Sequence, residues 1–99
     1  MANSEGPVLL SGGKTVAVAG TAEAMVSASQ RVKSVVIIAK SGNTNRVYLG
    51  GMDVDSATNG GLGAGESVTI EAVGWLDLVD VYLDVGVNGE GVDFYAVKA

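Results

Sequence analysis

Glycine most constrains the fold of this chain, because fifteen of its 99 residues are glycine and only one is proline. Glycine reaches positive φ without steric cost, so this content indicates many tight turns and disfavours long helices. Hydrophobic residues make up 47% of the chain, and valine is the commonest of them. Because β-branched side chains favour strands, the composition predicts an all-β protein.

Alternation of polar and apolar residues marks the expected strands. The clearest example is 67–71, in which Val68 and Ile70 point inward. The run 32–40 contains a continuous apolar stretch at 35–39, which is typical of a central strand buried on both faces. The turn residues 41–43 then predict a hairpin between this run and 46–49. Further strands are expected at 14–19, 76–87 and 92–97, with a short strand or turn over 21–26.

These segments predict one small β-sandwich or jelly roll of about seven to eight short strands, formed by residues 14–99. Residues 1–13 show no clear periodicity and are expected to form an extended N-terminal arm. The segment 53–66 reads as a surface loop that Leu62 anchors to the core.

The chain contains neither cysteine nor histidine. Disulfides, thiolate metal sites and the usual neutral-pH proton shuttle are therefore excluded, and we expect no enzymatic activity and no cofactor. A net charge of −5 argues against binding to nucleic acid. The longest apolar stretch is too short to span a bilayer and the first 20 residues do not resemble a signal peptide, so no membrane association is expected.

Carboxylates suggest two kinds of site, neither of which is the preferred interpretation. A degenerate calcium-loop pattern begins at Asp55 but has Ala57 at its third position, so a turn-rich loop explains it better. The candidate cation ligands are Asp53, Asp55, Asn59 and Glu66. Asp80 and Asp84 would lie about 13 Å apart along a strand, beyond the ~6.5–9.5 Å of an inverting glycosidase pair, so we expect a solvated face.

Trp75 and Tyr82 are candidate contact residues, since aromatic side chains stack on sugar rings or anchor protein interfaces. For Trp75, a position in the core is an equally good interpretation of the sequence.

The segment from Lys14 to Ala99 resembles small virion proteins of tailed bacteriophages, of the head decoration or capsid cement type. The resemblance is carried, in this order along the chain, by Thr15–Ala17, Gly20–Glu23, Val32–Val35, Ala39, Asn43–Gly50, Leu62–Ile70 (LGAGESVTI), Leu78–Tyr82 and Asn88–Val92. Where such loops often carry a proline, this chain has Ala64, which leaves the loop less rigid.

The resemblance implies a β-sandwich that stabilises the phage head as a homotrimer, bound to the major capsid protein through loops and termini. It implies no catalytic residues, and it implies a location on the virion head after synthesis in the host cytoplasm. The residues expected to contact the capsid or a neighbouring subunit are Val8, Leu9, Leu10, Lys14, Trp75 and Tyr82. The alternatives are a carbohydrate-binding module that uses Trp75 and Tyr82, and a β-sandwich associated with the tail or fibre.

Overall fold

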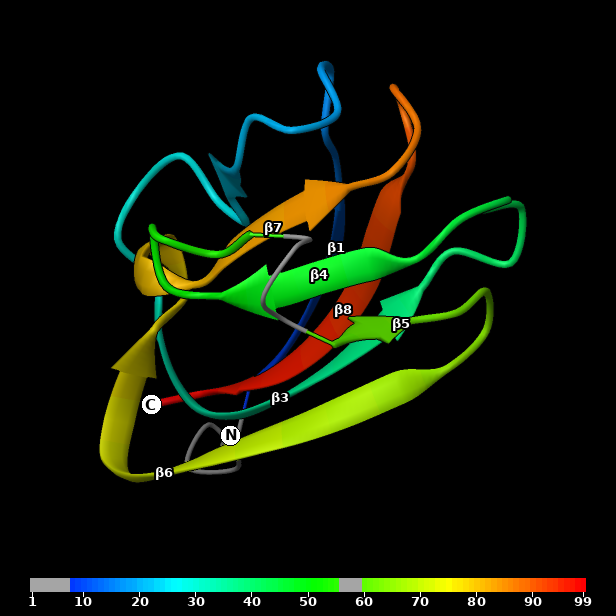
Figure 1. Ribbon diagram of the computed structural model, residues 1–99. Coiled ribbons are helices and arrows are strands. Elements are labelled where there is room, and N and C mark those ends of the chain that lie inside the picture. Colours follow the sequence, from blue (N-terminus) through cyan, green and yellow to red (C-terminus); the bar gives the residue numbers. More distant parts are fainter. Residues whose placement is uncertain (1–7, 56–59) are drawn as a thin grey trace.

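The computed structural model describes residues 8–55 and 60–99, which form two four-stranded antiparallel sheets packed face to face (Figure 1). The order in one sheet is β1-β8-β3-β6 and in the other β2-β7-β4-β5. The strands are β1 (Leu9–Thr15), β2 (Glu23–Ala24), β3 (Arg31–Ala39), β4 (Val47–Gly50), β5 (Gly61–Leu62), β6 (Ser67–Asp77), β7 (Tyr82–Val85) and β8 (Gly91–Lys98), with a 3-10 turn, η1, at Leu78–Asp80.

The strand pairing is that of a jelly roll. The first strand pairs with the eighth, the second with the seventh, the third with the sixth and the fourth with the fifth, all antiparallel. This ladder is a long ribbon folded back on itself, and it rolls up because β8 also pairs with β3 and β7 with β4. The prediction of a β-sandwich or jelly roll with seven to eight short strands is confirmed.

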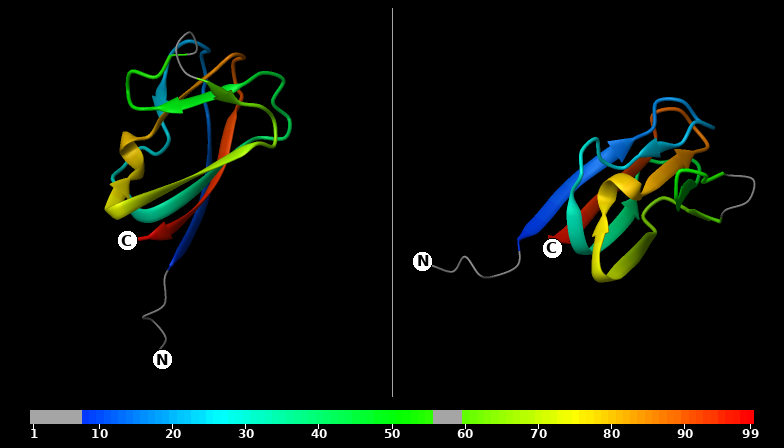
Figure 2. Two further views of the ribbon diagram at one scale, coloured as in Figure 1. Left: turned by 60° about the horizontal axis from the view of Figure 1, so that its bottom comes forward. Right: turned by 90° about the vertical axis from the view of Figure 1, so that its left-hand side faces the viewer.

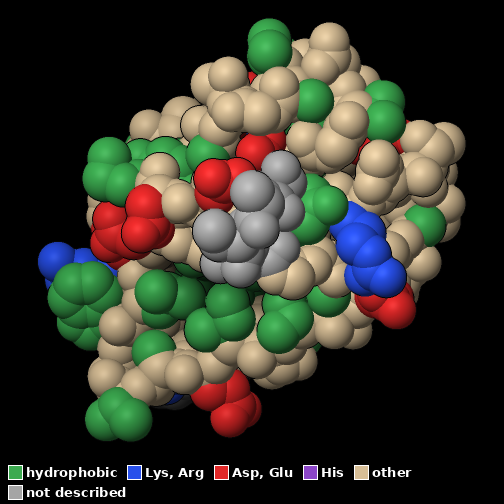
Figure 3. Space-filling view, in the orientation of Figure 1, with side chains coloured by type: hydrophobic (Ala, Val, Ile, Leu, Met, Phe, Trp, Pro, Cys, Tyr) green, Lys and Arg blue, Asp and Glu red, His purple; other side chains and the backbone are tan. Residues whose placement is uncertain are grey.

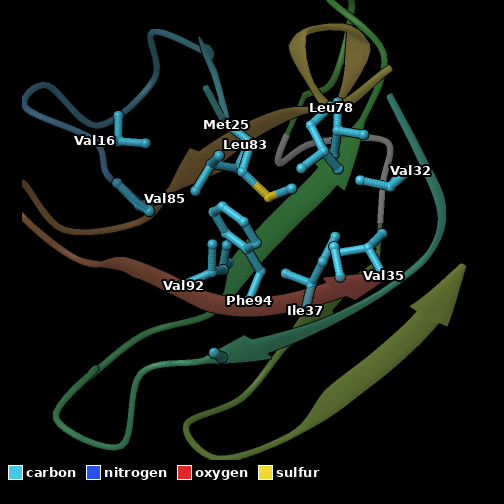
Figure 4. Packing of buried hydrophobic residues seen from close by; sticks show 14 residues of the cluster. Val16, Met25, Val32, Val35, Ile37, Leu78, Leu83, Val85, Val92 and Phe94 are labelled. Atoms are coloured by element: carbon cyan, nitrogen blue, oxygen red, sulfur yellow. The ribbon is translucent and has the colours of Figure 1, made fainter. Parts of the chain in front are cut away.

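The core lies between the sheets and is built from both of them (Figure 4). Ile37 of β3 and Phe94 of β8 face Leu83 of β7, and Met25 closes the space beside β2. The buried cluster comprises Val16, Met25, Val32, Val35, Ile37, Ala39, Val47, Leu78, Val81, Leu83, Val85, Val92, Phe94 and Ala96. Period-two strands produce this arrangement, because alternate side chains leave opposite faces of each sheet.

Strand β3 is central, as predicted, but only one of its faces is fully buried. Val35 and Ile37 lie in the core, whereas Val36 and Ile38 are half-buried on the outer face. The second sheet covers only the inner face, so the near-continuous apolar run did not indicate burial on both sides. Tyr95, which is paired with Val36, lies on the same outer face and is itself half exposed.

The predicted hairpin between 32–40 and 46–49 is wrong, because β3 and β4 belong to different sheets. The connecting segment crosses between the sheets and is held there by Glu90, whose carboxylate accepts hydrogen bonds from the Thr44 and Asn45 backbone N–H groups at 2.7 and 3.1 Å. These bonds lower the pKa of Glu90, with Thr44 making the largest contribution. The turn residues were recognised correctly, but a turn does not reveal whether the next strand pairs with the previous one.

The predicted N-terminal arm is wrong for Leu9–Gly13, since these residues belong to β1 and pair with β8 along its whole length. The strand expected at 14–19 ends at Thr15. The Val8 carbonyl also accepts a hydrogen bond from the Lys98 N–H at 2.8 Å. Two glycines within β1 hid its periodicity, and its partner lies at the far end of the sequence. Residues 1–7, the rest of the predicted arm, lie outside the described residues.

Two predictions about loops and strands have different outcomes. Leu62 is half-buried and packs against the core, as predicted, through the pairing of β5 with β4.

Asp84 does not lie on a solvated face: its side chain is 3% exposed and accepts hydrogen bonds from the N–H groups of Gly20 at 2.9 Å and Val85 at 2.8 Å. This carboxylate therefore fastens the β1–β2 connection to β7, a role that alternation alone does not reveal.

Candidate interaction site

A wide bulge interrupts β6, which is an edge strand of the first sheet. Ser34 pairs with Glu71 and Val32 pairs with Leu76, so residues 72–75 of β6 have a single residue of β3 opposite them. Such an insertion bends the strand and ends regular pairing there. Figure 1 shows the resulting sharp turn of β6 at the lower left.

The bulge places two apolar side chains in solvent, and we call residues 72–75 the β6 corner. Gly74 at its apex has a φ of +92°, a left-handed conformation that glycine adopts without strain. Val73 is fully exposed, at 107% of the reference area, and Trp75 is 50% exposed. Figure 3 shows hydrophobic and basic side chains together at this corner. Trp75 is therefore a surface residue and not a core residue.

Arg31 stacks on Trp75. Its guanidinium carbon lies 3.9 Å from the centroid of the indole ring, within the range of a cation–π interaction. Such a contact at an exposed site contributes about 0.5–1 kcal/mol. It holds the indole in one orientation, so less side-chain entropy would be lost if the corner entered an interface.

Basic residues gather at this end of the sheet. Arg31 and Lys33 are exposed on β3, and Lys98 is exposed on β8 opposite Val32. None of the three forms a salt bridge within the described part of the chain, whereas the other three basic residues do. Trp75 of the β6 corner and the neighbouring Arg31 are residue types typical of interface hot spots, and the charges of Lys33 and Lys98 add positive potential at this end of the sheet.

Asp77 fixes the position of the corner relative to the second sheet. Its carboxylate accepts hydrogen bonds from the Ser29 hydroxyl, from the Gln30 N–H at 2.9 Å and from the Val79 N–H at 3.1 Å. These bonds, that of Ser29 first, lower the pKa of Asp77, and the nearby Arg31 charge acts in the same direction. The ionised carboxylate therefore ties the end of β6 to the β2–β3 connection and to η1.

Four of the other predicted contact residues, Val8, Leu9, Leu10 and Lys14, lie at β1, on the opposite edge of the sheet from the β6 corner. Val8 and Leu9 are exposed at the start of this strand, whereas Leu10 is half-buried against the core. Strand β1 (blue) lies beside β8 (red) at the edge of its sheet (Figure 2). The Lys14 ammonium lies 2.8 Å from the carboxylate of Glu23, and this contact lowers the pKa of Glu23. Sequence reasoning proposed one set of contact residues, but the structure separates it into two surfaces.

A groove of about 640 Å³ runs between β1 and the segment that contains β2. Gly12 and Gly13 form one wall, and Phe94, Met25 and Tyr82 line its inside. Tyr82 therefore faces this groove, while Trp75 is not among its lining residues. The described residues thus provide no single platform made of both aromatic side chains.

A second groove, of about 380 Å³, was not anticipated from the sequence. It lies between β6 and β4 and is lined mainly by Leu49, Val68, Ile70, Leu76 and Val81. Figure 3 shows hydrophobic side chains in a row in this region. They remain accessible because β5, the edge of the second sheet, is only two residues long. Recognising this from the sequence would have required knowing how short β5 is.

The predicted cation ligands do not gather into a site that the structure describes. Within residues 8–55 and 60–99, no three acidic side chains come close enough to hold a metal ion. Glu66 instead accepts a hydrogen bond from the Gly63 N–H at 2.6 Å and lies 3.9 Å from Arg46. Asp53 and Asp55 lie before the undescribed segment, and Asn59 falls within it, so the full ligand set stays a prediction.

Comparison with known proteins gave no match: no family model, no curated protein and no solved structure is similar to this chain. Among the described residues, no helix is long and apolar enough to cross a membrane. A relationship to phage virion proteins therefore stays a prediction from the sequence segments quoted above.

Proposed function

We propose that this protein is a structural virion protein of a tailed bacteriophage that decorates the head and stabilises it by binding the major capsid protein. The observation that carries the proposal is the β6 corner, where a fully exposed valine and a half-exposed tryptophan project from a folded sheet. These apolar side chains are not buried by folding, so they contribute little to the core. They would contribute binding free energy if a partner covered them.

The fixed position of the β6 corner also supports a role in assembly. The exposed corner is fixed by Asp77 and by the stacked Arg31, so its shape exists before any partner arrives. Preorganised contacts lose little entropy on binding. On a symmetric shell, many such small contacts add up through multivalency, so no large apolar face is needed. The jelly-roll fold is compatible with this role, although a fold does not by itself define a function.

The test is co-sedimentation with phage heads from which this protein has been deleted. Saturable binding with a fixed copy number per head is the expected result. Val73→Ser and Trp75→Ala should each weaken binding by about ten-fold or more, because truncation of a central hot-spot residue removes ≥ ~2 kcal/mol. Quantitative gels of pelleted and free protein provide the measurement.

Val18→Ser is the matched control, because Val18 is also an exposed valine but lies in the β1–β2 connection. It should bind heads as the wild type does. Binding that is absent, or that all three variants weaken equally, would contradict the proposed contact.

A carbohydrate-binding module is the second candidate, on the strength of the exposed Trp75 ring. Arg31 covers one face of that ring, which leaves a single stacking face. Glycan binding that Trp75→Ala abolishes, together with no binding to heads, would favour this candidate.

A further inference from the structure

We propose that two copies of this chain pair through their β1 strands, antiparallel and across a two-fold axis at Ser11, to form one continuous eight-stranded sheet. This inference does not depend on the phage assignment. It rests on the free edge of β1, on the absence of any comparable edge in the described sheets, and on the sequence of the strand.

The free edge of β1 carries backbone groups that point away from the sheet. The Val8 carbonyl and the Val16 N–H both bond to the β8 side, to Lys98 and Glu90 respectively. Because bonding direction alternates along an antiparallel strand, even-numbered residues of β1 bond to β8 and odd-numbered residues point outward. The outward residues are Leu9, Ser11, Gly13 and Thr15. Among the described residues, none of their N–H or C=O groups has a hydrogen-bond partner on this side.

The other three sheet edges are protected. Strands β2 and β5 are each two residues long, and β6 is interrupted by its bulge. Short strands and bulges are the usual means of preventing edge-to-edge association. Strand β1 has seven residues with regular pairing throughout, no proline and a single charged residue. It is therefore the edge on which a further strand fits.

The strand begins Leu-Leu-Ser-Gly-Gly, which is complementary to itself in an antiparallel pair. With the two-fold axis at Ser11, Leu9 faces Gly13 of the second copy and Leu10 faces Gly12. Each leucine thus lies opposite a residue without a side chain, and the same contact occurs twice, as in any isologous interface. The pairs Leu9–Gly13 and Ser11–Ser11 each exchange two N–H···O=C hydrogen bonds.

Because the outward bonding groups alternate along β1, the register between the two copies can change only in steps of two residues. One such step moves the two-fold axis by one residue, to Gly12. Gly12 would then lie opposite Gly12 of the second copy, and Leu10 opposite Lys14. That register loses the complementarity, so the axis at Ser11 is favoured.

The groove beside β1 has room for the incoming leucine. On the inner face of the sheet, the ring of Phe94 lies directly against Gly12, so that a Cβ on this glycine would be 2.7 Å from the ring. Leu10 of the second copy would enter the groove of about 640 Å³ and pack on that ring. Within one copy, only a glycine at position 12 lets the Phe94 ring pack this close to β1. The ring then forms an apolar surface on which the second copy can pack.

Charge does not oppose the pairing, although the whole chain carries −5. Lys14 is the only charged residue of β1, and it is engaged by Glu23 of the same copy. In the proposed register it faces Val8 of the second copy, so no two like charges lie opposite each other.

A cysteine placed on the axis tests the geometry directly, because the chain has no cysteine of its own. In a hydrogen-bonded antiparallel pair, opposite Cα atoms are about 5.5 Å apart, which suits a disulfide. Ser11→Cys should therefore cross-link almost completely under mild oxidation, giving a product of twice the 9.9 kDa chain mass. Thr15→Cys, on the same strand, should not, because the two copies of that position lie roughly 27 Å apart at 3.4 Å per residue. Equal cross-linking of both variants would overturn the register.

Ser11→Pro tests the edge itself. It removes an outward N–H while leaving the bonds of Leu10 and Gly12 to β8 intact, as proline is tolerated on the solvent side of an edge strand. We expect the wild type and Ser11→Ala to be dimers by light scattering, and Ser11→Pro to be a monomer with an unchanged circular dichroism spectrum. A monomeric or trimeric wild type would overturn the proposal, as would a Ser11→Pro dimer. If Ser11→Pro does not fold, the cross-linking result and the wild-type mass decide.

A two-fold contact at β1 differs from the three-fold contact implied by the resemblance to decoration proteins. A trimer that binds heads would support the proposed function and overturn the β1 pairing. A dimer that does not bind heads would support the β1 pairing and overturn the proposed function.

Discussion

The two edges of the β1-β8-β3-β6 sheet are built in opposite ways. At one edge, β6 is eleven residues long, yet its bulge at 72–75 disrupts the row of backbone groups and turns it into an apolar corner. At the other edge, β1 is shorter but regular. The comparison shows that a sheet can present side chains at one edge and backbone groups at the other, which are chemically different ways of binding a partner.

The two edges are also fastened to the second sheet by different carboxylates. Asp77 holds β6 through three hydrogen bonds to the connection after β2 and to η1. Glu23 holds the end of β1 through Lys14 and also accepts a hydrogen bond from the Ala17 N–H at 2.9 Å. Each edge can therefore be perturbed separately, and the expected effects differ in size.

The largest effect is expected at Gly91, where β8 supports β1. A Cβ at this position would collide with the Lys14 carbonyl oxygen and lie 2.7 Å from the Cα of Thr15, both of which belong to backbone. Gly91→Ala should therefore lower the free energy of unfolding by about 3 kcal/mol or more. Urea denaturation measures this change. Gly42→Ala is the control, because a Cβ at Gly42 meets nothing within 4 Å, and a loss of equal size there would contradict the explanation.

A smaller effect is expected at the apex of the β6 corner. Gly74 has room for a Cβ, so only its φ of +92° opposes a substitution. Gly74→Ala should cost about 1–2 kcal/mol, the strain of a left-handed residue with a side chain. The same urea experiment measures it. If the variant were as stable as the wild type, the bulge would not depend on glycine.

Acid should weaken the fastening of both edges. Hydrogen bonds hold the pKa of Asp77 below its ordinary value, and Lys14 does the same for Glu23. A carboxyl group with a lowered pKa in the folded state contributes stability above its ordinary pKa and loses it as the pH falls through the lowered value. The melting temperature should therefore fall as the pH is lowered from 6 to 3, and less steeply in Asp77→Asn.

The control for the acid experiment is Glu71→Gln, which removes an exposed carboxylate from the same strand. It should keep the slope of the wild type. An identical slope in Asp77→Asn and the wild type would show that the edge is not fastened by this charge.

The smallest effect concerns the orientation of Trp75. Arg31→Ala should lower the free energy of unfolding by about 0.5–1 kcal/mol. Trp75 is the only tryptophan, so tryptophan fluorescence reports on the surroundings of this one ring. We expect a shifted emission maximum in Arg31→Ala and none in Lys33→Ala. A shift in both variants would indicate a general change in charge and not loss of the stacked contact.

Much of the fold could be predicted from local patterns. The segments 67–71 and 92–97 alternate clearly and are strands, and Leu62 was correctly expected to anchor its loop. The prediction failed for Leu9–Gly13, where glycines interrupt the alternation. It also failed for the hairpin at 41–43, because turn residues specify a change of direction and not the sheet to which the chain returns.

The candidate sites were predictable only in part. Trp75 was singled out because aromatic side chains often anchor interfaces, and Leu9 because it belongs to a short apolar stretch near the start of the sequence; both are exposed. Arg31 was missed, since a stacked guanidinium has no sequence signature across 44 residues. The bulge was also missed, because it exists only relative to the register of β3 and β6.

The sequence by itself determined that this chain forms β-sheets, because period-two alternation and turn glycines act over a few residues. Only the tertiary structure decided which strands pair, which edge is open and which apolar residues remain in water. Leu9 pairs with Val97, and no local preference connects residues so far apart. The pairing of these strands is selected because it buries one common core. We expect the protein to act through the two edges that this pairing leaves exposed, the β6 corner and β1.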